Sequence, residues 1–302
     1  MNQKQQIQPT PLDGIIYFTP PDDYQLSGRD GMVGILWGGM PPIPLLEEDF
    51  ASLETSCAPD YDMVGRGIYQ ALRLNPDCVG ASRYAAVLKE AYPHIVSELG
   101  GQIIMLEARE VDTPYLDRKI NFLKIMALID PDNADLPLEI ARAYIDKGSR
   151  LSSMQYAVTC WYAAEKQLKT ALTLNPDDIH AAYEYGEALY VLGRYGQAAE
   201  IWSGLITLLE PLERSRVEAR VAGILAGTIP MVSPLDYLTA LSIAVELHHN
   251  GSSAEAAAII KDVLADPTFI EQFPMNEVYY LLGTCYQEIG LMAEAAEAFK
   301  RS

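Results

Sequence analysis

Residues 179–211, with the sequence IHAAYEYGEALYVLGRYGQAAEIWSGLITLLEP, contain the pattern that decides the predicted fold. Small and large apolar side chains recur there three or four positions apart, which predicts two helices that each carry one apolar face. These positions are Ala182, Tyr185, Gly186 and Leu189 in the first helix and Ala198, Trp202, Leu205 and Leu208 in the second. Gly193 interrupts the pattern and is suited to end the first helix. The stretch therefore predicts two helices packed on each other, with Gly186 and Ala198 letting their backbones approach.

In this spacing the stretch resembles the tetratricopeptide repeat, a helix pair of about 34 residues whose signature places Leu-Gly, Tyr, Ala and Phe at fixed positions. It differs from the signature where Ala182 replaces a large residue and Trp202 replaces Phe. A second copy lies at Tyr279, Leu282, Gly283, Tyr286, Gly290, Ala295 and Phe299. The resemblance implies an all-α fold, an α–α superhelix or irregular solenoid of stacked helix pairs, and a function in binding other proteins.

Three similar phrases mark predicted repeat boundaries. Each is an apolar helix that ends in a polar or acidic residue and a proline, and the prolines are Pro76, Pro131 and Pro176. Because proline disfavours helix in the residue before it, the next helix is expected to start just beyond. The expected helices cover residues 47–56, 61–74, 79–91, 95–110, 115–129, 136–147, 155–174, 213–226 and 235–249, and a further helix carries Ala256, Ile260 and Val263 and is expected to stop at Asp266 and Pro267. The helix at 213–226 is additional to the regular pairs.

The first 46 residues differ from the rest, because they are rich in proline and glycine and show no helical period. We therefore divide the chain into a non-helical arm, residues 1–46, and a helical repeat domain, residues 47–302. Within the arm, residues 15–19 and 32–37 are expected to form a strand pair. The arm is expected to fold back as a cap over the first helices. The alternative is that residues 37–46 are extended and insert into a groove of this chain or of a neighbouring one.

The charge of the chain restricts its partners. Its formal net charge of −19, from 41 acidic and 22 basic residues, opposes binding to nucleic acid and to anionic membranes. A basic or apolar polypeptide remains compatible, although an acidic surface also serves solubility alone. The four cysteines lie far apart and lack flanking histidines, so neither a disulfide framework, a metal site nor a cofactor is expected. The absence of a recognisable signal peptide or membrane span favours a cytoplasmic protein without membrane insertion.

The sequence shows no catalytic motif. His248 and His249 are adjacent and would point in different directions on a helix, which does not suit a shared metal ion. Neither a phosphate-binding loop nor a nucleophile elbow occurs. An enzyme is therefore not expected. A pocket that holds a histidine, a carboxylate and a cysteine or serine within hydrogen-bonding reach would favour one.

The candidate binding surface is the concave face that the first helices of stacked repeats present. Its expected residues are Tyr183, Glu187, Tyr190, Leu241, Val245, His248, Tyr280, Thr284 and Gln287. Tyrosines offer a large contact area, and Glu187 favours a basic residue in the ligand. A clamp for a C-terminal carboxylate, which some members of the family form with Lys, Arg and Asn, is not expected, because Tyr and Glu occupy those places. The alternative is that some of these aromatic residues pack against the additional helix at 213–226.

The last repeat has no helix after it in the sequence, so Leu282, Ile289, Met292 and Phe299 are expected to be incompletely covered. This predicts a partner or an end-to-end homo-oligomer at the C-terminal repeat, and a truncated chain is the alternative. The sequence thus favours an interaction or assembly scaffold that binds a polypeptide segment in its groove. The other hypotheses are a non-catalytic structural subunit, a secretion-type chaperone of an oligomer, and a helical enzyme with an unrecognised site.

Overall fold

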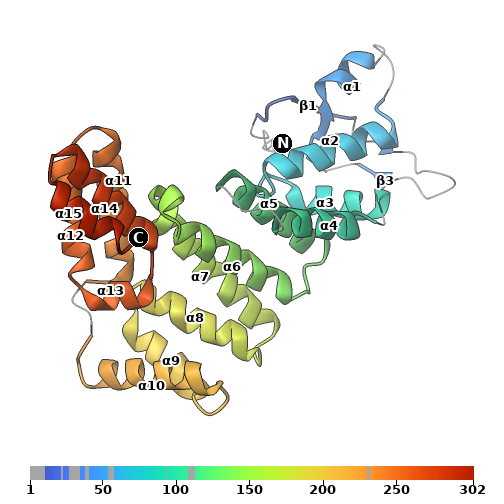
Figure 1. Ribbon diagram of the computed structural model, residues 1–302. Coiled ribbons are helices and arrows are strands. Elements are labelled where there is room, and N and C mark those ends of the chain that lie inside the picture. The colour runs from blue at the N-terminus through green and yellow to red at the C-terminus, as the bar shows by residue number, and fades with distance from the viewer. Residues whose placement is uncertain are drawn as a thin grey trace, which may run out of the picture. The chain divides into compact units, whose positions relative to one another are not determined.

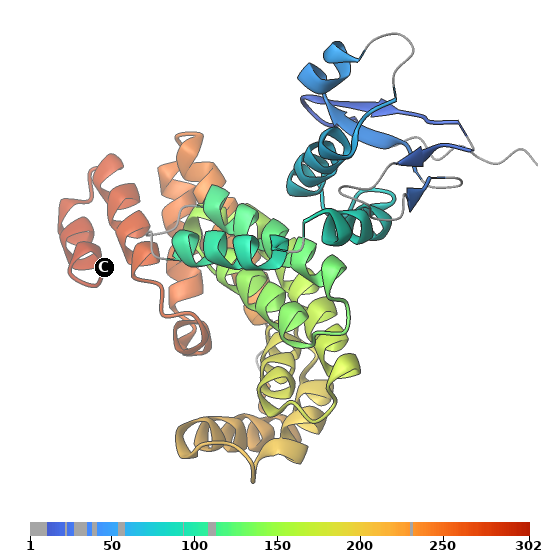
Figure 2. The same cartoon turned by 90° about the vertical axis from the view of Figure 1, so that its right-hand side faces the viewer.

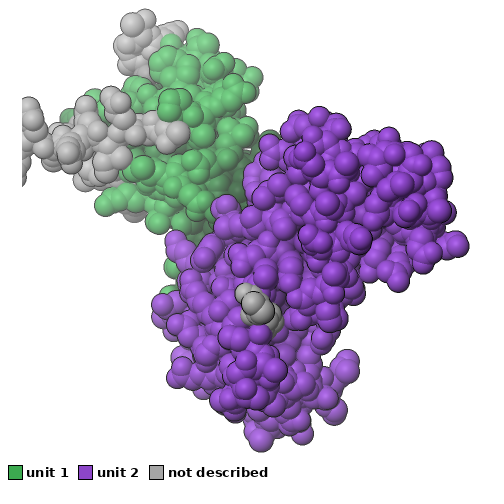
Figure 3. Space-filling view, turned by 90° about the vertical axis from the view of Figure 1, so that its left-hand side faces the viewer, with its two compact units in different colours: residues 1–136 green, residues 137–302 purple. Residues whose placement is uncertain are grey.

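The computed structural model describes residues 11–21, 23–26, 35–37, 41–53, 58–92, 94–107, 113–229 and 232–302. The chain forms two compact units, Met1–Leu136 and Pro137–Ser302 (Figure 3). Helices dominate both units, which confirms the predicted all-α class. The boundary between the units differs from the predicted division after residue 46, because the N-terminal arm packs into the same unit as the first helices.

Unit 1 combines short strands with a group of helices (Figure 1). Its elements are β1 (Ile15–Phe18), β2 (Gln25–Leu26), β3 (Ile35–Leu36), β4 (Ile43–Leu46), α1 (Glu47–Ser52), α2 (Tyr61–Leu74), α3 (Ala81–Ala91), α4 (Ile95–Glu107) and α5 (Thr113–Ile129). β1 pairs with β4 and β2 pairs with β3, both antiparallel. The predicted strand at 15–19 therefore forms, but the predicted pairing with 32–37 is wrong: β3 pairs with β2, and residues 32–34 lie outside the described part.

The arm folds back on the first helices, as expected, and it does so as an extended strand. β4 packs along α2, and the blue strands lie against that helix in Figure 2. Ile43 and Leu45 are fully buried, at 0% exposure. A Cβ atom at Gly67 of α2 would lie 2.0 Å from the carbonyl oxygen of Pro44, so only glycine admits the strand there. The hydroxyl of Tyr84 also donates a hydrogen bond to the carbonyl oxygen of Pro42, at 2.5 Å.

Unit 2 is helical throughout its described residues (Figure 1). Its elements are α6 (Asp135–Gly148), which begins at the end of unit 1, the 3₁₀ helix η1 (Leu151–Tyr156), α7 (Ala157–Leu174), α8 (Ile179–Val191), α9 (Tyr195–Leu205), α10 (Pro211–Leu225), α11 (Pro234–His249), α12 (Ser253–Leu264), α13 (Pro267–Gln272), α14 (Asn276–Glu288) and α15 (Met292–Phe299). The additional helix expected at 213–226 is α10. Helix α13 has no counterpart among the expected helices.

The two predicted helix pairs form, as α8–α9 and α14–α15, and they use the same close contact. In α8–α9, a Cβ atom at Gly186 would lie 2.2 Å from the indole nitrogen of Trp202. In α14–α15, a Cβ atom at Gly283 would lie 2.6 Å from the ring of Phe299. No methyl group fits at these distances unless the ring moves. In each pair, a glycine of the first helix therefore admits a large aromatic residue of the second.

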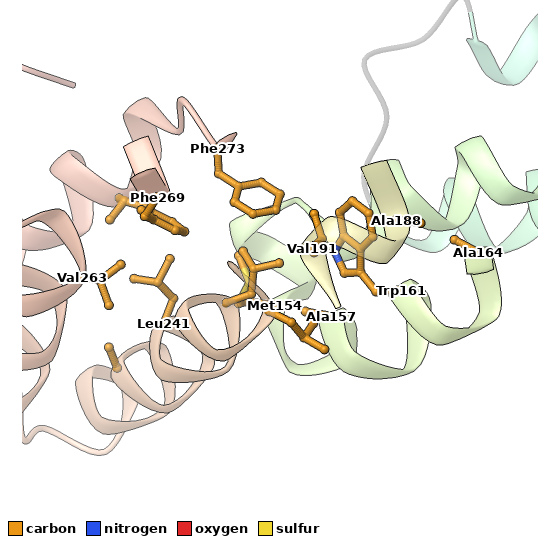
Figure 4. Packing of buried hydrophobic residues seen from close by; sticks show 14 of the residues in the cluster. Met154, Ala157, Trp161, Ala164, Ala188, Val191, Leu241, Val263, Phe269 and Phe273 are labelled. Atoms are coloured by element: carbon orange, nitrogen blue, oxygen red, sulfur yellow. The ribbon is translucent and has the colours of Figure 1, made fainter. Parts of the chain in front are cut away.

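The helix pairs do not pack in strict sequence order. α10 packs on α9, but α11 packs on η1 and α7, which lie before α8 in the chain. Leu241 of α11 shares a buried cluster with Met154 of η1 and Trp161 of α7, together with Phe269 of α13 and Phe273, the residue after α13 (Figure 4). A second buried cluster joins α8, α9 and α10. Unit 2 is thus an irregular solenoid in which α11 returns to earlier helices and does not extend the row beyond α10.

Candidate protein-interaction surface

The expected surface on α8 is covered by α10. Glu187 accepts two hydrogen bonds from the guanidinium of Arg220 on α10, at 2.7 Å and 2.8 Å. The same guanidinium lies over the ring of Tyr190, 4.5 Å from its centroid. Tyr190 is only 6% exposed, and Tyr183 is half-buried in the same cluster. The expectation that Tyr190 is exposed is therefore wrong, and the alternative, that these aromatic residues pack against the additional helix, is confirmed.

The contact between α8 and α10 is a built ionic network. The side chains of Arg220 and Glu187 are 9% and 15% exposed, so both charges are largely withdrawn from water. Arg220 also donates to Gln272 of α13, which ties that short helix into the network. Burial raises the pKa of Tyr190, which favours its neutral phenol. Some leucines of α10 are exposed and do not pack on α8, so the network accounts for much of the contact that holds α10 there.

The expected surface on α11 is also mostly buried. Leu241 has 0% exposure, because it faces the cluster that α11 forms with η1, α7 and α13. Val245 is half-buried, and the side chain of His248 is 17% exposed. The expectation that Leu241 lines an open face is wrong, because α11 packs on η1 and α7 and its apolar side is buried there.

His248 belongs to a cluster with the composition that would favour an enzyme. Its Nδ1 atom lies 3.7 Å from Sγ of Cys285 and 3.3 Å from Oε2 of Glu288, and Ser253 donates to the same carboxylate. A catalytic relay needs the carboxylate and the nucleophile on opposite ring nitrogens, whereas here both approach Nδ1. Burial, followed by the charge of Glu288, raises the pKa of Cys285 to about 11, so the thiol stays protonated. The cluster therefore has no nucleophilic arrangement.

Within the described part of the chain, no group of three His, Cys, Asp or Glu side chains has an arrangement that could hold a metal ion. None of the helices within the described ranges combines the length and the apolar character that a membrane span requires.

The expected surface on α14 remains accessible. Tyr280 is 61% exposed, Gln287 is exposed, and Thr284 is half-buried with its hydroxyl donating to the carbonyl oxygen of Tyr280 at 3.0 Å. Apolar side chains that the expected groove did not include are also exposed where α14 ends and α15 begins: Ile289, Leu291 and Met292 are 39%, 41% and 63% exposed. We call these six residues the terminal face. As expected, Ile289 and Met292 are incompletely covered, but Leu282 is only 8% exposed.

A groove that sequence reasoning missed lies between α12 and α15. Its volume is about 580 Å³, and α14 forms its floor. The lining residues are Lys261, Leu264 and Ala265 from α12 and the residue after it, Tyr279, Leu282 and Tyr286 from α14, and Ala293, Glu294, Glu297, Ala298 and Arg301 from α15 and the turn after it. These residues come from three separate helices, and no local motif in the sequence brings them together. We call this feature the α12–α15 groove.

Residues 161–203 match the family model of the tetratricopeptide repeat. The match covers most of α7, all of α8 and most of α9, which includes the Gly186–Trp202 contact. The predicted resemblance is thus confirmed over these residues, which form a tetratricopeptide repeat, a helical repeat of the kind whose stacked arrays present binding surfaces. No curated protein matches the sequence at a significant level.

Solved structures give distant similarities. A structure of the MamA protein has a TM-score of 0.30 and 16% identity, over 69% of this chain and 90% of that one. The TPR domain of P58(IPK) has a TM-score of 0.36 and 16% identity, over 80% and 60%. A human IFIT1 dimer with PPP-AAAA has a TM-score of 0.29 and 18% identity, over 81% and 58%. The chain spans less than two thirds of the latter two, and similarities this low carry no argument about function.

Proposed function

We propose that this chain is a scaffold that binds another protein and that the terminal face is its binding surface. The observation that supports this most strongly is the exposure of Tyr280 and Met292, at 61% and 63%, beside other apolar side chains. Such residues are enriched in protein interfaces, and contiguous apolar surface on a soluble protein marks interaction sites. The equivalent face of α8, by contrast, is covered by α10.

The chemistry around the terminal face favours a polypeptide with apolar and basic residues. Exposed carboxylates, Glu277 and Glu288, occur on the same helix as Tyr280. The net charge of −19 repels polyanions at long range and attracts cationic segments. An apolar contact flanked by acidic groups therefore suits a partner segment whose apolar residues lie beside lysine or arginine.

A second candidate is self-association, in which the terminal face of one copy packs on another copy. Leu291, in the turn before α15, and Met292, the first residue of α15, favour it, because both are exposed and exposed apolar side chains of this kind mark interaction sites. Sedimentation analysis at low and high protein concentration tests it. A mass that rises with concentration in the wild type, but not in Met292→Glu, supports self-association. A monomer at every concentration excludes it and leaves the binding of another protein.

The scaffold proposal is tested with matched tyrosine variants. Tyr280→Ala removes the exposed ring from the terminal face, and Tyr162→Ala removes a ring of α7 that is 47% exposed. Partners captured from a cell lysate by the wild type and by each variant are quantified by mass spectrometry. We expect at least one partner to be retained by Tyr162→Ala and lost by Tyr280→Ala. Equal recovery of every partner by all three proteins would contradict the proposal.

A further inference from the structure

The α12–α15 groove is separate from the terminal face. Successive residues of a helix are turned by about 100°, so the two sets of α14 residues lie on different sides of it. Gly283, which contacts the ring of Phe299, marks the line along which α15 packs. Tyr279 and Tyr286 lie on one side of this line and line the groove, whereas Tyr280 and Gln287 lie on the other. The chain therefore offers two surfaces, one on each side of α15.

The groove has an apolar floor. Leu282 and the rings of Tyr279 and Tyr286 face the space between the two walls, with Leu264 beside them. A volume of about 580 Å³ falls within the range of ligand-binding sites, which is roughly 300–1,000 Å³. It accommodates a few side chains of a peptide and is too small for a folded domain.

The groove is positive at one end. The guanidinium of Arg301 lies over the ring of Tyr279, 5.7 Å from its centroid, which places this cation at the start of α14. Ser253, at the N-terminal end of α12, donates a hydrogen bond to Glu288 at the C-terminal end of α14. The two helices are therefore antiparallel, and the C-terminal end of α12 lies near the start of α14. The floor residue at this end, Tyr279, adds a phenol that can accept or donate a hydrogen bond.

The groove is negative at its other end. α15 runs antiparallel to α14, so Glu294 lies toward Tyr286, about 10 Å from Arg301 along the helix axis. Lys261 on one wall and Glu297 on the other also line the groove and carry opposite charges. Within the described part of the chain, none of these four charged side chains is in an ion pair. Both ends of the groove are thus free to bind a charge.

We propose that the α12–α15 groove binds a short extended polypeptide segment that carries an acidic residue, apolar residues and a basic residue in a row. The acidic side chain pairs with Arg301, the apolar side chains cover Leu282 and the tyrosine rings, and the basic side chain pairs with Glu294. An extended chain advances about 3.3 Å per residue, so charges three positions apart match the separation of about 10 Å. This inference deepens the proposed scaffold function and rests on it.

The arrangement of charges selects this occupant over others. A polyanion is repelled by Glu294 and Glu297, and a uniformly basic segment is repelled by Arg301 and Lys261. Like charges brought together in this way disfavour the wrong partner, so complementarity serves specificity more than affinity. A neutral apolar segment fills the floor but leaves both end charges without partners.

The test uses three fluorescein-labelled peptides and the full chain. Each contains Leu-Leu between two charged residues: Glu-Leu-Leu-Lys, Glu-Leu-Leu-Glu and Lys-Leu-Leu-Lys, flanked by Gly and Ser. Binding is followed by fluorescence anisotropy up to millimolar protein. We expect the first peptide to bind the wild type about fivefold more tightly than the others, as one exposed charge pair allows. Equal binding of the three peptides, or none, would overturn the proposal.

Charge reversal in the protein gives the decisive second arm. Arg301→Glu makes both ends of the groove acidic, so the preferred peptide should become Lys-Leu-Leu-Lys. Lys169→Glu makes the same change of charge at an exposed position of α7 and should leave the preference unaltered. A shift of equal size in both variants would show a general charge effect and contradict a site. If the wild type shows no preference among the peptides but still recovers the partner that depends on Tyr280, the groove proposal is overturned and the scaffold function stands.

Discussion

The α8–α9 and α14–α15 pairs are built in the same way but have different surroundings. In both, a glycine of the first helix contacts an aromatic ring of the second. The first pair is covered by α10, with Tyr190 at 6% exposure, whereas the second leaves Tyr280 at 61%. The repeat pattern therefore specifies how two helices pack and does not specify what lies on their outer faces. What covers the outer face depends on the neighbouring helix, which for α8 is α10 with its Arg220.

The largest expected effect is the loss of the ionic network between α8 and α10. Arg220→Leu leaves the carboxylate of Glu187 buried without its partner and should reduce the free energy of unfolding by about 3–5 kcal/mol. Urea denaturation followed by circular dichroism measures this. Arg220→Leu/Glu187→Leu removes both charges and should recover most of the loss.

The control for this network is an exposed pair, Arg150 and Asp146, whose side chains are 38% and 44% exposed. Arg150→Leu should cost less than about 1 kcal/mol, because water screens such pairs. If Arg220→Leu is no worse than Arg150→Leu, the network does not hold α10 on α8.

A smaller effect is expected at the two glycines. Gly186→Ala should destabilise the protein by about 1–3 kcal/mol, because the new methyl group meets the fully buried ring of Trp202. Gly283→Ala should cost less, since Phe299 is only partly buried and its ring can move outward. Thermal unfolding of both variants checks the order. A larger loss at Gly283 than at Gly186 would contradict the expectation that the buried ring of Trp202 has less room to move than the ring of Phe299.

The buried thiol of the α14 pair predicts a dependence on pH. The pKa of Cys285 is raised to about 11 in the folded state, whereas an unfolded thiol ionises near pH ~8.5. The unfolded state therefore loses its proton first, so the stabilisation is complete below pH ~8.5 and falls as pH rises toward 11. The free energy of unfolding, measured between pH 8 and pH 10, should decline less steeply in Cys285→Ala than in the wild type. Equal slopes would count against burial of the thiol.

The smallest effect is expected at the terminal face. Tyr280→Ala should change the free energy of unfolding by less than about 0.5 kcal/mol, as is usual for exposed positions. Tyr190→Ala, which removes a ring packed under Arg220, should cost about 3 kcal/mol or more. Chemical denaturation of the two variants side by side measures the difference. Similar losses in both would mean that α10 does not cover the face of α8.

Much of the fold could be predicted from the sequence because its signals are local. Apolar periodicity gave α8, α9, α14 and α15, and the glycine at position 186 predicted a close approach to the second helix that the structure confirms. Helix α13 could not be found in the same way. Pro267 was expected to stop a helix, but Asp266 accepts a hydrogen bond from the backbone of Thr268 and so caps a new one.

The site was harder to predict, because exposure depends on contacts between distant residues. Glu187 and Arg220 are separated by 33 positions, and nothing at Glu187 indicates its partner. The burial of Leu241 could not be predicted either, because the apolar side of α11 is equally compatible with a core and with a groove. The packing of α11 on η1 and α7 decides between them. Tyr280, which was expected on the accessible face of the first helix of its pair, is 61% exposed.

Photo-crosslinking at matched positions tests most directly whether only the second pair has an open face. Benzoylphenylalanine is placed at Tyr280 or at Tyr183, and crosslinks to other proteins are detected by mass spectrometry. We predict crosslinks from the position of Tyr280 and none from that of Tyr183, whose helix is covered by α10. Crosslinks from Tyr183 in equal yield, or none from Tyr280, would contradict the assignment of the terminal face.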